Sequence, residues 1–255
     1  MKNITKLFIP MLLSFTYVSN INAQVSVRVS IRIAPPVIPV YQQPVCPTEG
    51  YLWIPGYWGY GTYGYYWIPG YWTTPPKIGY LWTPGYWTFV EGFYKWTPGY
   101  WGVHVGYYGG INYGFGYYGT GFVGGIWKGS VFCYNTAVVH VNTVVVHNTY
   151  INKTVVVHTP ATCYSYNGIG GVTRQATHTE TIYSNEAHIH ATSVQTHYVS
   201  VAGSNKTQYY SNNHGVPPTT VVTNDNTEYK SYNKTSVRKI NNGVHVERTR
   251  VRVRK

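Results

Sequence analysis

Histidines are the most numerous side chains in this sequence that could bind a metal ion. Ten histidines outnumber seven carboxylates and three cysteines, and three of them, His140, His147 and His158, close valine-rich phrases. Neighbouring strands could bring these rings together, and imidazole suits zinc or copper. A second set lies further along the chain: His178, His188, His190 and His197. Because a histidine at a strand end is often only solvated, both interpretations stay open, and we predict no metal site and no cofactor.

Three cysteines are the next candidates for chemistry: Cys46, Cys133 and Cys163. In an oxidising compartment they allow one disulfide and leave one thiol over. Cys133 and Cys163 bracket the valine-rich block, whose ends a stack of hairpins would bring together. We predict this pair as the disulfide, which would add roughly 3 kcal/mol of stability. A catalytic cysteine is the competing interpretation, but no nucleophile motif accompanies these residues.

Carboxylates are too few to indicate an enzyme. The whole chain has seven: Glu49, Glu91, Glu180, Glu186, Asp225, Glu228 and Glu247. Glycoside hydrolysis needs a close carboxylate pair, and no motif marks one, although Glu180 and Glu186 remain open. HExxH, GxSxG and phosphate-loop patterns are absent. We therefore predict no catalytic residues.

Two glycine strings match the pattern G-x-G-x-x-G, at residues 114–119 and 119–124. A dinucleotide site of this type needs a strand before the glycines and a helix after them. No helix is expected nearby, and a block this rich in glycine produces such matches by chance. The sequence predicts strands here instead of a nucleotide site.

One sequence phrase occurs four times, and we expect it to form the strands that position any functional side chain. The copies read GYLWIPGYW, GYYWIPGYW, GYLWTPGYW and FYKWTPGYW, and their first tryptophans are separated by 14, 15 and 14 residues. A fixed period indicates a repeated structural unit. Recurring proline and glycine exclude helix, and tyrosine and tryptophan favour strands. The sequence predicts an all-β fold: a meander of short aromatic-rich hairpins in which each copy adds two strands.

The Pro-Gly pair in each copy is the predicted turn of the chain. Proline presets φ for the first corner of a type II turn, and glycine supplies the positive φ that the next position needs. The predicted turn residues are Pro55, Gly56, Pro69, Gly70, Pro84, Gly85, Pro98 and Gly99.

These phrases resemble the YXWGXW repeat family, also written WXXGXW, of exported bacterial envelope proteins. The first tryptophan, the glycine and the last tryptophan of each copy match that signature. The fourth copy departs from the others, because Phe93, Tyr94 and Lys95 precede Trp96. The resemblance covers about a fifth of the chain. It implies a secreted envelope protein with no family active site to carry over.

The 44 aromatic residues among 255 are more than a small core can hide. We expect one set of rings to pack inward and the opposite set to form a row of exposed faces, suited to sugar rings or another protein surface. The alternative is that the tryptophans replace leucine and isoleucine as a mutual core. The predicted binding array is Tyr51, Trp53, Trp58, Tyr66, Trp67, Trp72, Trp82, Trp87, Trp96 and Trp101.

The first residues have the layout of a secretory signal peptide. Lys2 and Lys6 precede an apolar run, and small or polar residues lead to Ala23, the predicted cleavage site. The apolar run is too short to span a bilayer, and no later stretch approaches the necessary length. We therefore predict export without a transmembrane span, to the periplasm, an outer-membrane-associated position or the cell surface.

Composition divides the chain into successive segments. They are residues 1–23 (signal peptide), 24–49 (N-terminal strand and proline-rich connector), 50–101 (four repeats), 102–125 (Gly/Tyr-rich block), 126–169 (Val/Thr/Asn-rich β segment) and 170–255 (polar, partly disordered basic region). Within the second segment, apolar and polar residues alternate strictly from Val25 to Ile33, which predicts a half-buried strand. Residues beyond 170 have too few aliphatic side chains to offset ordering entropy.

A formal net charge of +12 indicates attraction to polyanions, and the arginine-rich C-terminus carries much of it. Candidates are anionic lipid or glycan surfaces of the envelope; an alternative is that the charge only keeps the protein soluble. No groove-reading helix is expected, so specific nucleic-acid binding is not predicted.

Two functions follow from these features. The first is a non-enzymatic envelope protein that uses its aromatic repeat array to bind a partner protein or itself. The alternative is a glycan-binding or peptidoglycan-binding module that uses exposed tryptophan and tyrosine faces.

Overall fold

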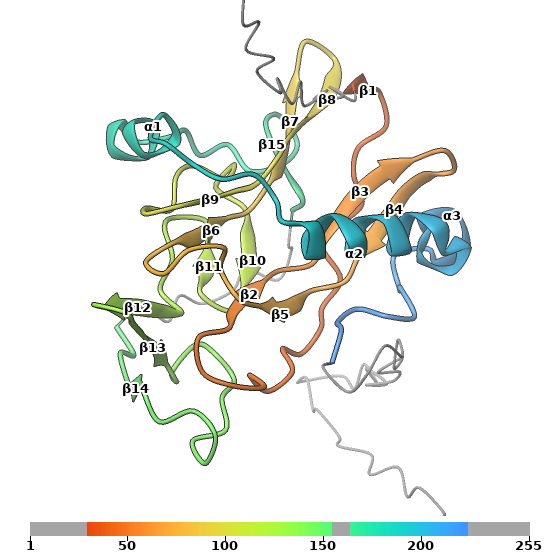
Figure 1. The fold of residues 1–255 in the computed structure, drawn as a ribbon. Coiled ribbons are helices and arrows are strands. Elements are labelled where there is room, and N and C mark those ends of the chain that lie inside the picture. The colour runs from red at the N-terminus through yellow and green to blue at the C-terminus, as the bar shows by residue number, and fades with distance from the viewer. Residues whose placement is uncertain (1–29, 155–163, 224–255) are drawn as a thin grey trace, which may run out of the picture.

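A computed structural model describes residues 30–154 and 164–223 of the chain. Short strands dominate and form small, mostly antiparallel sheets around an aromatic core, while the helices gather in the last part of the chain (Figure 1). The predicted all-β, aromatic-rich hairpin fold is confirmed. The predicted signal peptide, Val25 to Val29 of the predicted strand, and the arginine-rich end lie outside the described residues.

Repeats one and two together form one long hairpin. Its strands are β2 (Leu52–Ile54), β3 (Tyr57–Gly61), β4 (Gly64–Ile68) and β5 (Tyr71–Thr73). The inner strands β3 and β4 pair with each other, and the outer strands β2 and β5 pair with each other. Each phrase adds two strands, as predicted, but the structural unit is a pair of phrases.

Repeats three and four form a second hairpin of the same design. Its strands are β6 (Leu81–Thr83), β7 (Tyr86–Val90), β8 (Phe93–Thr97) and β9 (Tyr100–Gly102), with β7 paired to β8 and β6 to β9. Each tryptophan and each Pro-Gly pair of the repeated phrases in the first hairpin has its equivalent 29 positions later in the second. The two hairpins can therefore be compared residue by residue.

The prediction that the Pro-Gly pairs turn the chain is wrong at all four sites. Each pair separates two strands of the same hairpin arm, and none of the four glycines has a φ in the left-handed region. Those glycines are Gly56, Gly70, Gly85 and Gly99. The turns lie instead at the hairpin tips, where Gly64 (φ 97°) and Gly92 (φ 81°) adopt the conformation that glycine favours.

The remaining strands extend and flank these hairpins. β1 (Ser30–Ile31) pairs with β8, and β15 (Tyr166–Asn167) pairs with β7, which gives a four-stranded sheet in the order β1-β8-β7-β15. Two smaller sheets consist of β10 (Asn112–Gly114) with β11 (Tyr117–Tyr118), and of β12 (Gly125–Lys128), β13 (Val131–Asn135) and β14 (Thr149–Tyr150).

The valine phrases that end at His140 and His147 form turns where strands were expected. Asn135 and Asn142 explain the difference, because their side-chain oxygens accept hydrogen bonds from the backbone two residues further on, at Ala137 and Val144. Such local bonds compete with strand pairing. The third phrase, which ends at His158, lies outside the described residues.

The prediction of a loosely structured region beyond residue 170 is wrong for the part that the structure describes. Helices α1 (His178–Ser184) and α2 (Ser193–Ser204) are followed by a 3-10 turn (Lys206–Gln208) and α3 (Tyr210–Asn213). α1 and α2 each begin with a capping box, Thr177 with Glu180 and Thr192 with Gln195. These polar pairs stabilise helices in a stretch with few aliphatic residues.

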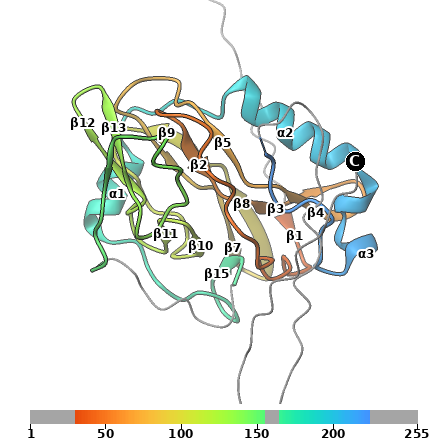
Figure 2. The ribbon, with the colours of Figure 1, turned by 90° about the horizontal axis from the view of Figure 1, so that it is seen from below.

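Helix α2 covers the outer face of the first hairpin, and α3 lies beside it (Figure 2). Ala202 of α2 packs with Tyr66 and Ile68 of β4 and with Tyr209 in a small buried cluster. None of the helices in the described residues is long and apolar enough to cross a membrane.

Candidate functional site: the paired aromatic hairpins

Four cross-strand tryptophan pairs form the centre of the two hairpins. They are Trp53 with Trp72, Trp58 with Trp67, Trp82 with Trp101 and Trp87 with Trp96. Their ring centroids lie 5.2 to 5.4 Å apart, at interplanar angles between 54° and 69°. Tilted pairs at this distance contribute about 0.5–1.5 kcal/mol each beyond the burial of their area. The period of the sequence thus places indole against indole across each hairpin.

The glycine of each phrase makes room for an indole of the partner phrase. A Cβ on Gly70 would lie 2.5 Å from Cζ2 of Trp53, and a Cβ on Gly56 would collide with Cζ2 of Trp67. The second hairpin repeats this arrangement, with Gly85 against Trp96 and Gly99 against Trp82, both at 2.5 Å. The repeated spacing of tryptophan and glycine within the phrase therefore reflects close packing across the hairpin and not a turn.

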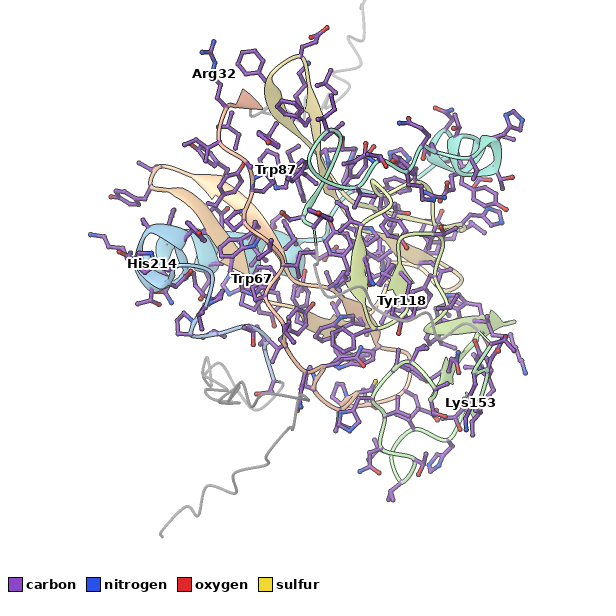
Figure 3. All side chains as sticks on the ribbon, turned by 180° about the vertical axis from the view of Figure 1, so that it is seen from behind. Arg32, Trp67, Trp87, Tyr118, Lys153 and His214 are labelled. Carbon is purple, nitrogen blue, oxygen red and sulfur yellow. The ribbon has the colours of Figure 1, made fainter. Side chains whose placement is uncertain are left out.

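Most of the predicted binding array is buried. Trp67 and Trp87, labelled in Figure 3, lie among other side chains inside the molecule. Eight of the ten rings are buried: Trp53, Trp58, Tyr66, Trp67, Trp72, Trp82, Trp87 and Trp101. Only Tyr51 and Trp96 are partly exposed. The expected row of exposed ring faces is wrong, because the tryptophans form the mutual core that was the alternative interpretation.

Indole N–H groups bind irregular segments to the first hairpin. Nε1 of Trp58 donates to the carbonyl of Val37 at 3.0 Å, and Nε1 of Trp72 donates to that of Pro44 at 2.9 Å. Nε1 of Trp67 reaches the carbonyl of Thr220 at 3.1 Å, across 153 positions of sequence. Each bond satisfies a backbone carbonyl in a segment that has no ladder of its own.

Two further indoles join larger parts of the fold. Nε1 of Trp87 donates to the carbonyl of Trp58 at 2.8 Å, which links the two hairpins. Nε1 of Trp101 donates to Oε1 of the buried Gln195 at 2.6 Å and thereby holds α2 against the second hairpin. Sequence reasoning missed Gln195; its only signal was the T-x-x-Q capping pattern that starts at Thr192.

Buried tyrosines from the Gly/Tyr-rich block hold the second hairpin in the same way. The hydroxyl of Tyr113 donates to the carbonyl of Gly85 at 2.6 Å, and that of Tyr117 donates to the carbonyl of Trp82 at 3.0 Å. Burial raises the pKa of both phenols well above 10.0. The phenols therefore stay protonated, as a donor must.

The two hairpins differ at their second Pro-Gly pair. In the first, Gly70 donates to the carbonyl of Thr220 at 3.1 Å, and its own carbonyl accepts from the N–H of Val222 at 2.8 Å. Within the described residues, no backbone partner is found for the equivalent Gly99. Trp67 is fully buried, whereas the equivalent Trp96 is partly exposed and stacks on Tyr57 at 5.1 Å.

Two hollows lie near the hairpins. The smaller, of about 90 Å³, lies between the hairpins beside Trp96, Gly99 and Gln195. It has room for about three water molecules and none for a sugar ring. The larger, of about 340 Å³, is a groove between residues 44–47, residues 142–145 and the pair Val222 and Thr223, with Trp72 at its base.

The carboxylates of the described residues have structural partners. Glu180 accepts from the backbone of Thr177 and forms an ion pair with Arg174 at 2.6 Å. Hydrogen bonds from the backbone N–H groups of His147 and Asn148 hold the pKa of Glu49 below its ordinary value. The other partnerships are Glu186 with His104 and Glu91 with Lys95. No carboxylate lines either of the two hollows described above.

Among the described residues, no group of three or more histidines, cysteines or carboxylates is placed to hold a metal ion. His140 lies within hydrogen-bond distance, 3.1 Å, of the backbone carbonyl of Gln43. Cys46 and Cys133 are buried and form no disulfide with each other, and Cys163 lies outside the described residues. The disulfide between Cys133 and Cys163 therefore stays a prediction.

A comparison with known protein families supports the hairpin of two phrases as the structural unit. Residues 50–73 and 78–102 match the family model described as the WXXGXW repeat, in two copies. Each copy covers one hairpin of two phrases, so the family resemblance drawn from the sequence is confirmed. No curated protein and no solved structure matches the chain.

The close contact between each repeat glycine and an indole ring predicts how a substitution at the glycine changes the stability of the protein. Gly56→Ala should lower the free energy of unfolding by about 3 kcal/mol, the upper end of the usual cost of overpacking, because the new methyl group must displace the buried ring of Trp67. Gly64→Ala is the matched control at the tip of the same hairpin, where a Cβ meets nothing within 4 Å. It should cost only about 1 kcal/mol through its positive φ. Chemical denaturation that gave equal losses for both variants would contradict the packing account.

Alkaline pH should destabilise the protein. Burial raises the pKa of the Cys46 thiol from 9.0 to about 11 and that of Tyr113 well above 10.0. The folded state then holds these protons more tightly than the unfolded state, so their contribution is complete below about pH 9 and declines as the pH rises further. Denaturation at about pH 8 and about pH 11 should show the loss, with a further rise in tyrosinate absorbance on unfolding as buried phenols such as Tyr113 become exposed. Equal stability at both pH values would contradict this.

Proposed function

We propose that this protein is an exported, non-enzymatic interaction module of the cell envelope. In this proposal the two WXXGXW hairpins are a rigid scaffold, and the loops that their indoles hold in place contact a protein partner. The buried rings cannot themselves serve as contact faces in this conformation. The scaffold's contribution is therefore to fix the surface segments around it.

The observation that carries the proposal is the valine-rich groove beside Trp72. Val45 and Val145 line it and are 42% and 43% exposed, and Val144 next to them is 79% exposed. The exposed aliphatic side chains around this groove of about 340 Å³ favour a surface that binds another protein. Cys46, held by a backbone hydrogen bond to the carbonyl of His140, keeps its two walls in fixed relation.

Other features support the non-enzymatic and exported parts of the proposal. Each described carboxylate caps a helix, accepts hydrogen bonds from a loop or pairs with a basic side chain. None of them therefore forms a pair that could act as a general acid and a general base. The signal-peptide layout of residues 1–23 supports export. The net charge of +12 supports contact with the anionic surfaces of an envelope.

Affinity capture from the native envelope tests the proposal. Tagged protein should recover a partner in fixed ratio from gently solubilised envelopes, and peptidoglycan digestion should not change that ratio. Val145→Asp should abolish recovery, because it places a charge on the groove's apolar rim. Val216→Asp is the matched control, since Val216 is 73% exposed but does not line the groove.

Three outcomes decide between the alternatives. Loss of the partner with Val145→Asp alone supports the groove as the contact surface. Recovery of a second, differently tagged copy of the chain identifies self-association as the form of binding. Equal recovery with both variants, or recovery of glycan with partners lost after digestion, would overturn the proposal in favour of a wall-binding module.

A further inference from the structure

The first hairpin holds a peptide carbonyl beside its second Pro-Gly pair. The carbonyl oxygen of Thr220 accepts two hydrogen bonds there, from Nε1 of Trp67 and from the N–H of Gly70, both at 3.1 Å. An indole N–H and a glycine N–H thus converge on one oxygen atom. Because both donors belong to the repeated phrase, the phrase itself builds a small carbonyl-binding site.

The second hairpin has the same two donors without that carbonyl. They are Nε1 of Trp96 and the N–H of Gly99, which stand 29 positions after their counterparts. The ring of Trp96 packs against Gly85 as the ring of its counterpart packs against Gly56, so the two indoles are placed alike. Within the described residues, neither of these N–H groups has a hydrogen-bond partner.

Gln195 adds a third donor to the hollow of about 90 Å³ that Trp96 and Gly99 line. Its Oε1 accepts from Nε1 of Trp101 and from the N–H of Thr192, which fixes the amide with Nε2 as the remaining group. Gln195 is 3% exposed, and its Nε2 has no hydrogen-bond partner in the part of the chain that the structure describes.

The hydroxyl of Tyr71, on the wall of the same hollow, is close to Gln195 but forms no hydrogen bond with Nε2. A buried N–H without an acceptor is costly. The hollow therefore favours a ligand that supplies an acceptor oxygen.

The walls of the hollow define the rest of the ligand. They are formed mostly by prolines and aromatic rings, and none of the described residues that line it is charged. A neutral carbonyl is therefore preferred to a carboxylate, which would lose its hydration without gaining an opposite charge. Pro98 and Ala191 line the hollow and are exposed, which places its opening beside them. Only a small terminal group can enter, and the body of a larger molecule stays outside.

We propose that this hollow binds an acetamido group. Its carbonyl oxygen lies between Nε1 of Trp96 and the N–H of Gly99, and its methyl group packs against the prolines of the wall. The volume, which equals that of about three water molecules, is sufficient for this group. N-acetylated amino sugars and other acetylated amines both carry it. The hollow shares no lining residue with the valine-rich groove, so the two proposals are tested separately.

Saturation-transfer NMR with the full exported chain tests the proposal. The probes are N-acetylglucosamine, N-methylacetamide and, as the matched sugar without the acetamido group, glucose. The acetyl methyl protons should receive the strongest saturation, with a dissociation constant on the order of millimolar for so small a group. Glucose should receive none. Tighter binding of N-acetylglucosamine than of N-methylacetamide would identify an amino sugar as the source, and equal binding would assign recognition to the acetamido group alone.

Three variants locate the binding. Ala191→Leu narrows the opening from an exposed position and should abolish the saturation of the methyl protons. Trp96→Phe keeps an aromatic ring but removes Nε1, and should weaken binding about fivefold. Trp127→Phe is the matched control, because Trp127 is also partly exposed but does not line the hollow, and it should leave binding unchanged.

Two results would overturn the proposal. One is equal saturation of N-acetylglucosamine and glucose, or none of either, as expected of a hollow that holds only water. The other is undiminished binding to the Ala191→Leu variant, which would place the ligand elsewhere on the molecule.

Discussion

The fold depends on one steric constraint, the contact between an indole and a glycine of the opposite strand. Trp53 lies on Gly70 and Trp67 lies on Gly56, and the second hairpin repeats both contacts. A side chain at any of these glycines would lift a ring out of its place, and the ring's cross-strand partner would lose its contact as well. Because the contact is reciprocal, two phrases are needed to complete it. This explains why the family repeat spans a whole hairpin rather than one phrase.

A core made of tryptophan and tyrosine can also donate hydrogen bonds to buried backbone carbonyls, which an aliphatic core could not do. Long segments of this chain have no strand partner and would leave buried backbone carbonyls unsatisfied. The rings pack as apolar bodies, while their N–H or O–H groups donate to those carbonyls, as Trp58 does to Val37 and Tyr113 does to Gly85. The many tryptophan and tyrosine residues therefore hold irregular loops in place. The proposed interaction surface is formed by such loops and needs them to be fixed.

The sequence predicted the strands and their aromatic content but not how the strands pair. Periodicity identifies a repeated unit without stating whether one phrase or two complete it, and Pro-Gly is common in turns. It therefore predicts a turn at Pro55 and Gly56, which instead separate β2 from β3. The burial of Trp72 could not be predicted, because the segments that cover it lie far away in sequence. The helices after Thr177 and Thr192 were missed because capping boxes, not a hydrophobic stripe, mark them. The groove at Val45 and Val145 depends on three distant segments and leaves no local pattern.

Hydrogen exchange of the indole N–H groups is the most direct measurement of the central claim that the rings are a hydrogen-bonded core. Six of the nine indoles donate to carbonyl groups: Trp58, Trp67, Trp72, Trp87, Trp101 and Trp127. The account predicts that these six indole protons exchange only through larger openings of the fold and are strongly protected. Rapid exchange of most of the six in the folded protein would contradict it, because the rings would then be exposed faces rather than the core.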